Sequence, residues 1–322
     1  MNSIEEILEG AESIAIAGHV NPDGDCIGSC MAMYLYLKAN DPNIKADVYL
    51  GDMRPVFGHL DGLETVRKTA ESGKIYDLLL LFDVSSEDRI GIAGEYLQTA
   101  KKTVCIDHHI TNHGLAEINH VVPKASSTCE VLFELMEREK ITVPVATALY
   151  TGIVHDSGVF QYTNTSGKTM RIAGWLMDQG IPFTRIIEDS FYKKSYDQNR
   201  IMGQTLMKSQ LLLDGKCIAG VVTKKDMKQY GAAPQDLDGV VNQLRLTEGV
   251  EAAVFLYAVD PEHYKVSLRS NGVVDVSRIA ASFEGGGHRM AAGCTLAGEP
   301  EEIIEKVVTC IRRQLKAEKK KR

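Results

Sequence analysis

Short apolar runs alternate with longer segments of helical periodicity in the first half of the chain. The runs are brief, rich in aliphatic residues and bounded by polar ones, which is typical of buried strands, and they occupy residues 13–18, 47–50, 77–82 and 103–106. Helices are expected at 24–39, from the Ser127–Glu130 capping box to a point before Pro144, and from Pro144 to about His155. This alternation predicts an α/β domain whose mostly parallel sheet carries helices on both faces.

The second half of the chain predicts a smaller α/β region. The segment 182–213 is long, charged and helical in character, strands are expected at 217–223, 252–258 and 264–269, and a last helix is expected from Pro300 to about Lys316. After it comes a basic tail that ends at Arg322, and we expect this tail to be solvated. We therefore expect domains at 1–190 and 214–322, joined by a helical linker at 191–213.

Composition and charge exclude several classes of protein. With 322 residues, 44% hydrophobic and 25% charged, the chain is ordinary globular protein with room for two domains of roughly 100 to 200 residues each. Its net charge of −7 argues against a surface that coats DNA generically, but is compatible with a locally bound anionic substrate. We find neither a signal-peptide pattern nor an apolar run of about 20 residues, so we expect a soluble, cytoplasmic protein. The seven cysteines lack CxxC spacing and are expected to be reduced thiols.

Ionisable side chains follow the carboxyl ends of three predicted strands and of one predicted helix. In chain order they are His19, Asp23 and Asp25, then Asp83, then Asp107, His108 and His109, and finally Asp156. Because ligands of open α/β sheets lie outside the carboxyl ends of the strands, we expect these side chains to converge. Each has an ordinary alternative explanation. Taken alone, Asp83 and Asp156 could be helix caps or surface charges, and His19 could be a hydrogen-bonded core residue. Asp23 and Asp25 could cap the helix that follows them.

The joint pattern favours a metal centre over these separate explanations. Imidazoles and carboxylates without a thiolate suit Mn²⁺ better than a structural zinc ion. Taking six of these eight side chains as ligands gives too many for one catalytic ion, but it suits two ions roughly 3.5 to 4 Å apart that share a carboxylate and a water. Two such ions would lower the pKa of the shared water to give a hydroxide and would neutralise a phosphoryl group.

A glycine-rich segment, FEGGGHRMAAG at 283–293, suggests an anion site in the second half. Its consecutive glycines would let the backbone approach a ligand closely, and His288 adds a donor; a tight strand-to-helix turn is the alternative. It matches neither a Walker A loop nor a dinucleotide-binding fingerprint. Just upstream, strand alternation places Ser267 and Arg269 on one face, where Arg269 is either a bidentate phosphate ligand or a surface charge.

These motifs, in this order, resemble those of the DHH phosphoesterase superfamily with a DHH-associated C-terminal domain. The resemblance covers nearly the whole chain and is closest to the bifunctional oligoribonuclease and PAP phosphatase (nanoRNase) branch. It implies a DHH domain at 1–190 and a DHH-associated substrate-binding domain at 214–322, with the active site in the cleft between them. Two departures stand out: Glu284 replaces a glycine that is usual in the family, and His155 replaces a small or hydroxyl residue.

The resemblance also implies a role for each site residue. One Mn²⁺ is expected on His19, Asp23 and Asp83, and a second on Asp25, Asp83, His108 and Asp156, with Asp83 bridging the two ions. Asp107 is expected to orient His108, and His109 to face the scissile phosphate as donor or acid. A nucleotide or its terminal phosphate is expected on Ser267, Arg269, Gly286, Gly287 and His288.

The expected function is that of a Mn²⁺-dependent exoribonuclease. It would release 5′-mononucleotides from very short RNA and, as a second activity, convert 3′-phosphoadenosine 5′-phosphate (pAp) to AMP. The alternatives are a phosphodiesterase for c-di-AMP or pApA, a pyrophosphatase or polyphosphatase, and a non-catalytic RNA-binding module. An inorganic substrate needs no nucleoside-binding residues, so the glycine-rich segment and the strand before it argue against a pyrophosphatase or polyphosphatase. The complete set of metal ligands argues against a non-catalytic module. A homodimer is left open.

Overall fold

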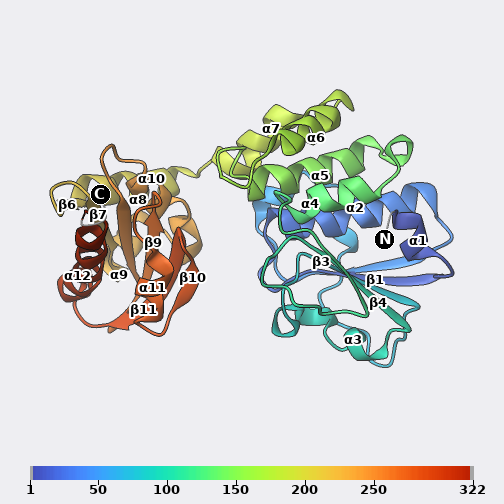
Figure 1. Ribbon diagram of the computed structural model, residues 1–322, viewed down its shortest axis with the longest axis horizontal. Coiled ribbons are helices and arrows are strands. Elements are labelled where there is room, and N and C mark those ends of the chain that lie inside the picture. The colour runs from blue at the N-terminus through green and yellow to red at the C-terminus, as the bar shows by residue number, and fades with distance from the viewer. Residues whose placement is uncertain (1–2, 320–322) are drawn as a thin grey trace. The chain divides into compact units, whose positions relative to one another are not determined.

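The structure is a computed structural model that describes residues 3–319 (Figure 1). The chain divides into two compact units, Met1–Lys193 and Lys194–Arg322. The last residues of the expected basic tail, 320–322, lie outside the described range.

A parallel five-stranded sheet forms the centre of the first unit. Its order is β2-β1-β3-β4-β5, and its strands are β1 (Ser13–Ala17), β2 (Lys45–Tyr49), β3 (Leu78–Phe82), β4 (Lys102–Asp107) and β5 (Ile118–Val121). Every neighbouring pair is parallel. The four strands predicted from apolar runs are confirmed to within two residues at each end, whereas β5 was not predicted.

Both faces of this sheet are buried. Ile14 and Ile16 of β1 pack in one core, while Ala15 and Ala17 pack in the other. Burial on both faces explains why the runs are continuously apolar and do not alternate with polar residues. Figure 1 shows α2, α4 and α5 on one side of the sheet and α3 on the other. The helices of the unit are α1 (Ile4–Leu8), α2 (Gly24–Asn40), α3 (Tyr96–Thr99), α4 (Thr128–Leu135), α5 (Val143–Asp156), α6 (Gly167–Asp178) and α7 (Phe183–Ile187).

The long helix expected across 182–213 is wrong, because the chain breaks there. After α7, a π-helical turn covers Glu188–Tyr192, and Lys193 is extended. A new helix, α8 (Tyr196–Lys208), begins at a capping box: Ser195 Oγ accepts from the backbone N–H of Gln198, and Gln198 Oε1 accepts from the backbone N–H of Ser195. Ile201 of α8 belongs to the core of the second unit, so α8 packs as part of that unit.

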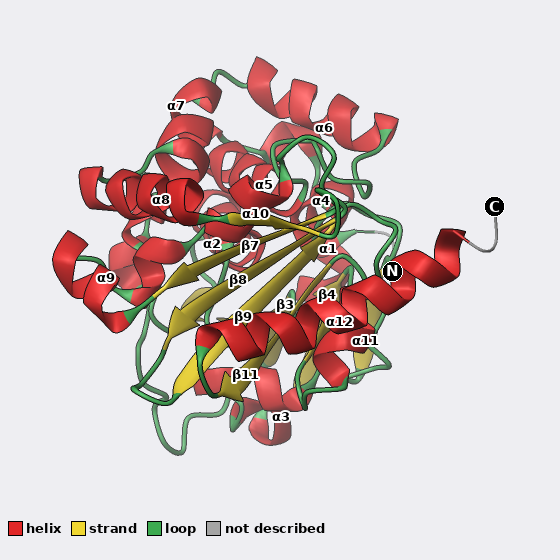
Figure 2. Cartoon of the chain, turned by 90° about the vertical axis from the view of Figure 1, so that its left-hand side faces the viewer, coloured by secondary structure: helices red, strands yellow, loops and turns green. Residues whose placement is uncertain are grey.

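A mixed six-stranded sheet forms the second unit, and Figure 2 shows α12 lying across it. Its order is β10-β11-β9-β8-β7-β6, and only β7 and β8 run parallel. The strands are β6 (Gln210–Leu212), β7 (Cys217–Val222), β8 (Ala252–Ala258), β9 (His263–Ser270), β10 (Gly286–His288) and β11 (Ala291–Ala297). The helices are α9 (Lys224–Tyr230), α10 (Val240–Arg245), α11 (Val276–Ala281) and α12 (Pro300–Lys319). Among the described residues, no helix combines the length and apolarity needed to cross a membrane.

Candidate metal centre

The carboxyl ends of β1, β3 and β4 bring the predicted ligands together. His19 follows β1, Asp83 follows β3 directly, and Asp107 is the last residue of β4. Asp83 turns the chain at φ +60°, a left-handed conformation that aspartate adopts more readily than most residues. Topology alone therefore gathers groups that are far apart in the sequence.

Asp83 lies at the middle of the cluster and is only 3% exposed. Its Oδ2 lies 3.5 Å from His19 Nε2, while its Oδ1 lies 3.7 Å from His108 Nε2 and 3.5 Å from His109 Nδ1. The two oxygens of one carboxylate thus face different imidazoles. This is the arrangement that a bridging carboxylate requires.

The remaining candidates complete groups on both sides of Asp83. Asp23 Oδ1 lies 3.7 Å from His19 Nε2, and the same oxygen caps α2 by accepting from the Asp25 and Cys26 backbones. Both the ligand and the cap interpretations of Asp23 therefore agree with the geometry. On the other side, His108 Nε2 lies 3.4 Å from Asp156 Oδ2 and 4.0 Å from Asp25 Oδ2. Within residues 3–319, three sets are close enough to hold an ion: His19, Asp23 and Asp83; Asp25, His108 and Asp156; and Asp83, His108 and His109.

The histidine rings are oriented as metal-binding imidazoles usually are. His19 Nδ1 lies 2.7 Å from the Val20 carbonyl, and His108 Nδ1 lies 3.4 Å from the Ala125 carbonyl. A proton on each Nδ1 directs the Nε2 lone pair at the carboxylates. Nitrogen and oxygen donors without thiolate fit a hard or borderline divalent ion.

The N-terminus of α4 holds two of the carboxylates, a role that the sequence did not reveal. The backbone N–H groups of Thr128 and Cys129 donate to the two oxygens of Asp25, at 2.6 and 2.9 Å. The Thr128 hydroxyl donates to Asp83 Oδ1 at 3.0 Å. The Ser127–Glu130 capping box predicted this helix start, but only the fold shows that it points at the ligands.

The charges of the cluster explain why it favours a cation. Burial, together with the charges of Asp83 and Asp156, raises the pKa of Asp25 well above its ordinary value. Burial and the nearby aspartates likewise raise the pKa of Asp156 to about 8. Burial opposes charge on His19, but hydrogen bonds to Asp23 and Asp83 outweigh it and raise the pKa of His19 to about 11. Crowded carboxylates therefore recruit positive charge, which a divalent ion can supply.

The expectation that Asp107 orients the His108 ring is wrong in this structure. Asp107 Oδ1 lies 2.8 Å from His109 Nδ1 and accepts from the backbone N–H of His108 at 2.7 Å, so its carboxylate fixes the His109 ring and only the backbone of His108. Asn112, which was not predicted, donates to Asp107 Oδ2 at 2.8 Å and to the Val84 carbonyl at 3.0 Å. The hydrogen bond with Asp107 raises the pKa of His109 to about 9 despite burial.

In the second unit, the glycine-rich segment is a β-hairpin and not a strand-to-helix turn. β10 pairs with β11, which pairs with β9, so that two registered rows cross three strands: Gly286, Gly293 and Ser267, and His288, Ala291 and Arg269. These rows bring together four of the residues predicted to hold substrate, and the fifth, Gly287, lies between them on β10.

Close strand packing gives a structural reason for two of the glycines. A Cβ at Gly285 would lie 2.3 Å from the Gly293 carbonyl oxygen, and Gly287 has φ +138°. Glu284, at φ +58°, takes a left-handed conformation without being glycine.

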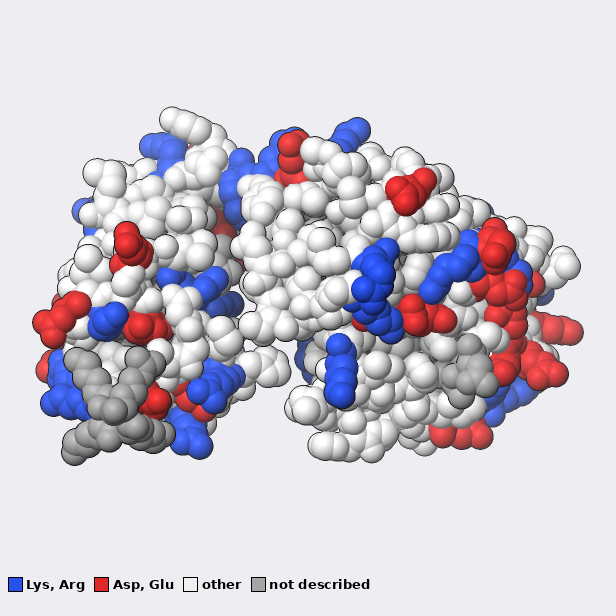
Figure 3. Space-filling model, turned by 45° about the horizontal axis from the view of Figure 1, so that its top comes forward, with Lys and Arg blue, Asp and Glu red and all other residues white. Residues whose placement is uncertain are grey.

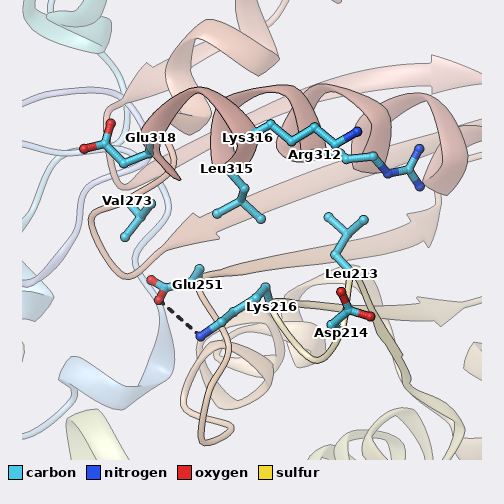
Figure 4. A pocket seen from close by; sticks show the side chains of 9 residues that line it. All are labelled: Leu213, Asp214, Lys216, Glu251, Val273, Arg312, Leu315, Lys316 and Glu318. Atoms are coloured by element: carbon cyan, nitrogen blue, oxygen red, sulfur yellow. Dashed lines mark ion pairs between the residues drawn. The ribbon is translucent and has the colours of Figure 1, made fainter. Parts of the chain in front are cut away.

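A separate cavity of about 350 Å³ in the second unit contains none of the predicted site residues (Figure 4). Leu315 points into it from α12, and Lys216 forms an ion pair with Glu251 at 3.7 Å. Its charged lining is balanced between Lys216, Arg312 and Lys316 and Asp214, Glu251 and Glu318. The cavity therefore lacks the net positive charge that an anionic substrate would need.

Comparison with known proteins identifies the class to which this fold and site belong. Residues 13–153 match the model of the DHH family, N-terminal domain, and residues 214–317 match that of the DHHA1 domain. Together with the full-length relatives described next, these matches show that the chain belongs to the DHH family of phosphoesterases, as its motifs predicted.

Several similar proteins share one description, bifunctional oligoribonuclease and PAP phosphatase NrnA. The protein from Thermus thermophilus is 30% identical over 98% of this chain and 94% of its own length. That from Bacillus subtilis is 27% identical over 88% of this chain and 90% of its own length. A crystal structure of an exopolyphosphatase-related protein from Bacteroides fragilis has a TM-score of 0.84 at 26% identity, covering 97% of this chain and 94% of that one. Both units thus have counterparts in these proteins.

Proposed function

We propose that this protein is a Mn²⁺-dependent phosphoesterase that hydrolyses very short RNA to 5′-mononucleotides and also converts pAp to AMP. The single observation that carries the metal-dependent chemistry is the position of Asp83, whose two oxygens face His19 and His108. The substrate class is supported by the similarity to oligoribonuclease and PAP phosphatase relatives over nearly the full chain.

The site residues divide into two proposed groups of ligands. We assign His19, Asp23 and Asp83 to one ion, and Asp25, Asp83, His108 and Asp156 to the other. Bound there, two divalent ions would supply an activated water and neutralise charge on the phosphoryl group. The chain itself keeps the carboxylates in place through the N-terminus of α4 and the Thr128 hydroxyl.

His109 is the proposed proton donor to the leaving oxygen. Its Nδ1 is engaged with Asp107, which leaves Nε2 as the nitrogen assigned to substrate, and the ring is 27% exposed. In the metal-free protein the hydrogen bond with Asp107 raises the pKa of the His109 ring to about 9, which favours the protonated form that a proton donor needs. Asp107 and Asn112 hold it in that orientation.

The hairpin rows of the second unit are the proposed nucleotide grip. Arg269 would pair with a phosphate, while Ser267, His288 and the Gly286 and Gly287 backbone would add hydrogen-bond donors. On the face shown in Figure 3, basic and acidic side chains are interspersed over both units. This mixture suits a short substrate held locally better than a long nucleic acid held along a basic surface.

Relative turnover tests the proposal. Purified protein with Mn²⁺ is given pApA, a short RNA, pAp, c-di-AMP and pyrophosphate. We expect turnover of the short RNA, pApA and pAp. Hydrolysis of pyrophosphate alone would end the nuclease proposal, and a strong preference for c-di-AMP would replace it with a cyclic-dinucleotide phosphodiesterase. Asp52, whose side chain is fully exposed, provides a matched control: Asp52→Ala should keep the activity that Asp83→Ala loses.

A further inference from the structure

The imidazole of His155 fills the space beside Gly24, at the start of α2. Gly24 lies between Asp23 and Asp25, and His155 immediately precedes Asp156 in the last turn of α5. A Cβ atom at Gly24 would lie 2.3, 2.5 and 2.8 Å from Cγ, Cβ and Cδ2 of His155. Only glycine therefore lets the His155 side chain pack directly on the backbone that carries two proposed metal ligands.

A hydrogen bond and two aromatic rings hold His155 from other directions. Its Nε2 lies 2.9 Å from Ser190 Oγ, and the Ser190 hydroxyl donates to the Ile186 carbonyl at 2.6 Å. Because a hydroxyl has a single proton, His155 Nε2–H is the donor to Ser190. The rings of Phe57 and Phe191 have centroids 5.0 and 5.6 Å from that of the imidazole.

Ser190 and Phe191 both belong to the π-helical turn Glu188–Tyr192. Such turns are rare and are found disproportionately at functional sites. Ser190 is only 3% exposed, so its contact with His155 is shielded from water. The turn thus contacts the imidazole through the Ser190 hydrogen bond and the Phe191 ring, and substitutions can remove either contact.

We propose that His155 is a positioning residue of the metal centre: it sets the separation between Asp156 and the loop that carries Asp23 and Asp25, and Ser190 holds it in place. The inference rests on the proposed metal site and is independent of the substrate. His108 Nε2 lies 3.4 Å from Asp156 and 4.0 Å from Asp25, so one imidazole depends on both aspartates being correctly placed. Functional sites must be held within about 0.5 Å of their productive geometry, so a ring packed against the ligand loop is placed where even a small shift would matter.

Mn²⁺ binding to four variants tests this role without any substrate. Gly24→Ala, His155→Ala, the double variant and Ser190→Ala are titrated with Mn²⁺, and free Mn²⁺ is followed by electron paramagnetic resonance. We expect Gly24→Ala and His155→Ala each to weaken binding by about 10- to 100-fold, the range found for residues that support metal ligands. In the double variant the added methyl group no longer meets Cγ and Cδ2 of residue 155, although the two Cβ atoms still approach to 2.5 Å, so the combined loss of affinity should be smaller than the product of the two single losses. Gly174→Ala is the matched control, since a Cβ there meets nothing within 4 Å.

Several outcomes would overturn the proposal. One is a wild-type Mn²⁺ affinity in His155→Ala. Another is a loss of Mn²⁺ affinity in the double variant that equals the product of the losses in the two single variants. If the His155 variants do not fold, judged by circular dichroism without metal, Ser190→Ala decides: unchanged affinity refutes the supporting role, and a weaker one supports it. A wild-type protein that binds no Mn²⁺ would overturn both this inference and the proposed metal site. Normal binding without nucleotide hydrolysis would overturn only the proposed substrate.

Discussion

Thr128→Val should weaken the metal centre although it leaves the shape of the side chain nearly unchanged. The Thr128 hydroxyl donates to Asp83 Oδ1 at 3.0 Å, and both residues are almost fully buried. Hydrogen bonds to charged groups contribute about 1.5–3 kcal/mol, and about 1.4 kcal/mol is a factor of ten. Losing this bond from the carboxylate that we propose as the bridge therefore predicts a loss of about 10- to 100-fold in Mn²⁺ affinity or turnover, which is also the range for comparable supporting residues.

Mn²⁺ titration and steady-state hydrolysis of pApA measure this effect separately. Thr128→Ser keeps the hydroxyl and should recover most of the loss, while the backbone bonds from Thr128 and Cys129 to Asp25 remain in both variants. Thr147→Val is a matched control, because Thr147 is also buried but donates to the Val143 carbonyl within α5. Wild-type affinity and turnover in Thr128→Val would refute the idea that this hydroxyl positions Asp83.

Four further predictions concern single residues or pH. Asp83→Ala should abolish hydrolysis of every substrate, and a fully active variant would contradict the bridging role. Arg269→Ala should raise KM more than it lowers kcat, because we assign Arg269 to binding; the exposed Arg278→Ala is its control, and equal effects would argue against the assignment. Glu284→Gly should raise the free energy of unfolding by about 0.5–1 kcal/mol in urea titrations, since it relieves a left-handed φ of +58°, and a destabilised variant would disprove this. In metal-free protein, the pKa values of Asp156 and His19 are raised to about 8 and about 11, so the folded state retains protons that the unfolded chain releases. The melting temperature in chelator should therefore fall from about pH 6 to 9, and Mn²⁺ should protect more at the higher pH; a rise in chelator would refute the reasoning.

The convergence of the candidate ligands was predictable because two simple rules apply to them. Continuous apolar runs mark strands buried on both faces, and parallel strands end at one edge of the sheet. His19 and Asp83 follow such runs directly, and only Asp107 separates His108 from its run. Edge strands escaped prediction for the opposite reason: Ile118–Val121 has no apolar run, and Gly286–His288 is exposed throughout, so both exist only through pairing with a neighbour.

Side-chain orientation was the part that the sequence could not supply. Adjacent positions in Asp107-His108-His109 give no indication of which ring meets the carboxylate, because this depends on how the chain turns after β4. Asn112 closes that turn onto Asp107 from five residues away. By contrast, the break before α8 was readable: Ser195 and Gln198 form a capping box, which signals a new helix start inside the segment interpreted as continuous.

Two kinds of group offset the negative charge of the buried carboxylates in the metal-free protein: hydrogen-bond donors and bound protons. Only the protons depend on pH, and this dependence links folding to metal binding. N–H and hydroxyl donors from Thr128 and Cys129 are fixed and independent of pH. Protons on His19 and Asp156 are the other kind, and they must leave before those groups can act as ligands. A cation that replaces these protons takes over their stabilising charge, so metal binding should release protons and grow stronger as pH rises. The same crowding of carboxylates that destabilises the metal-free centre at high pH is therefore what gives it affinity for a divalent ion.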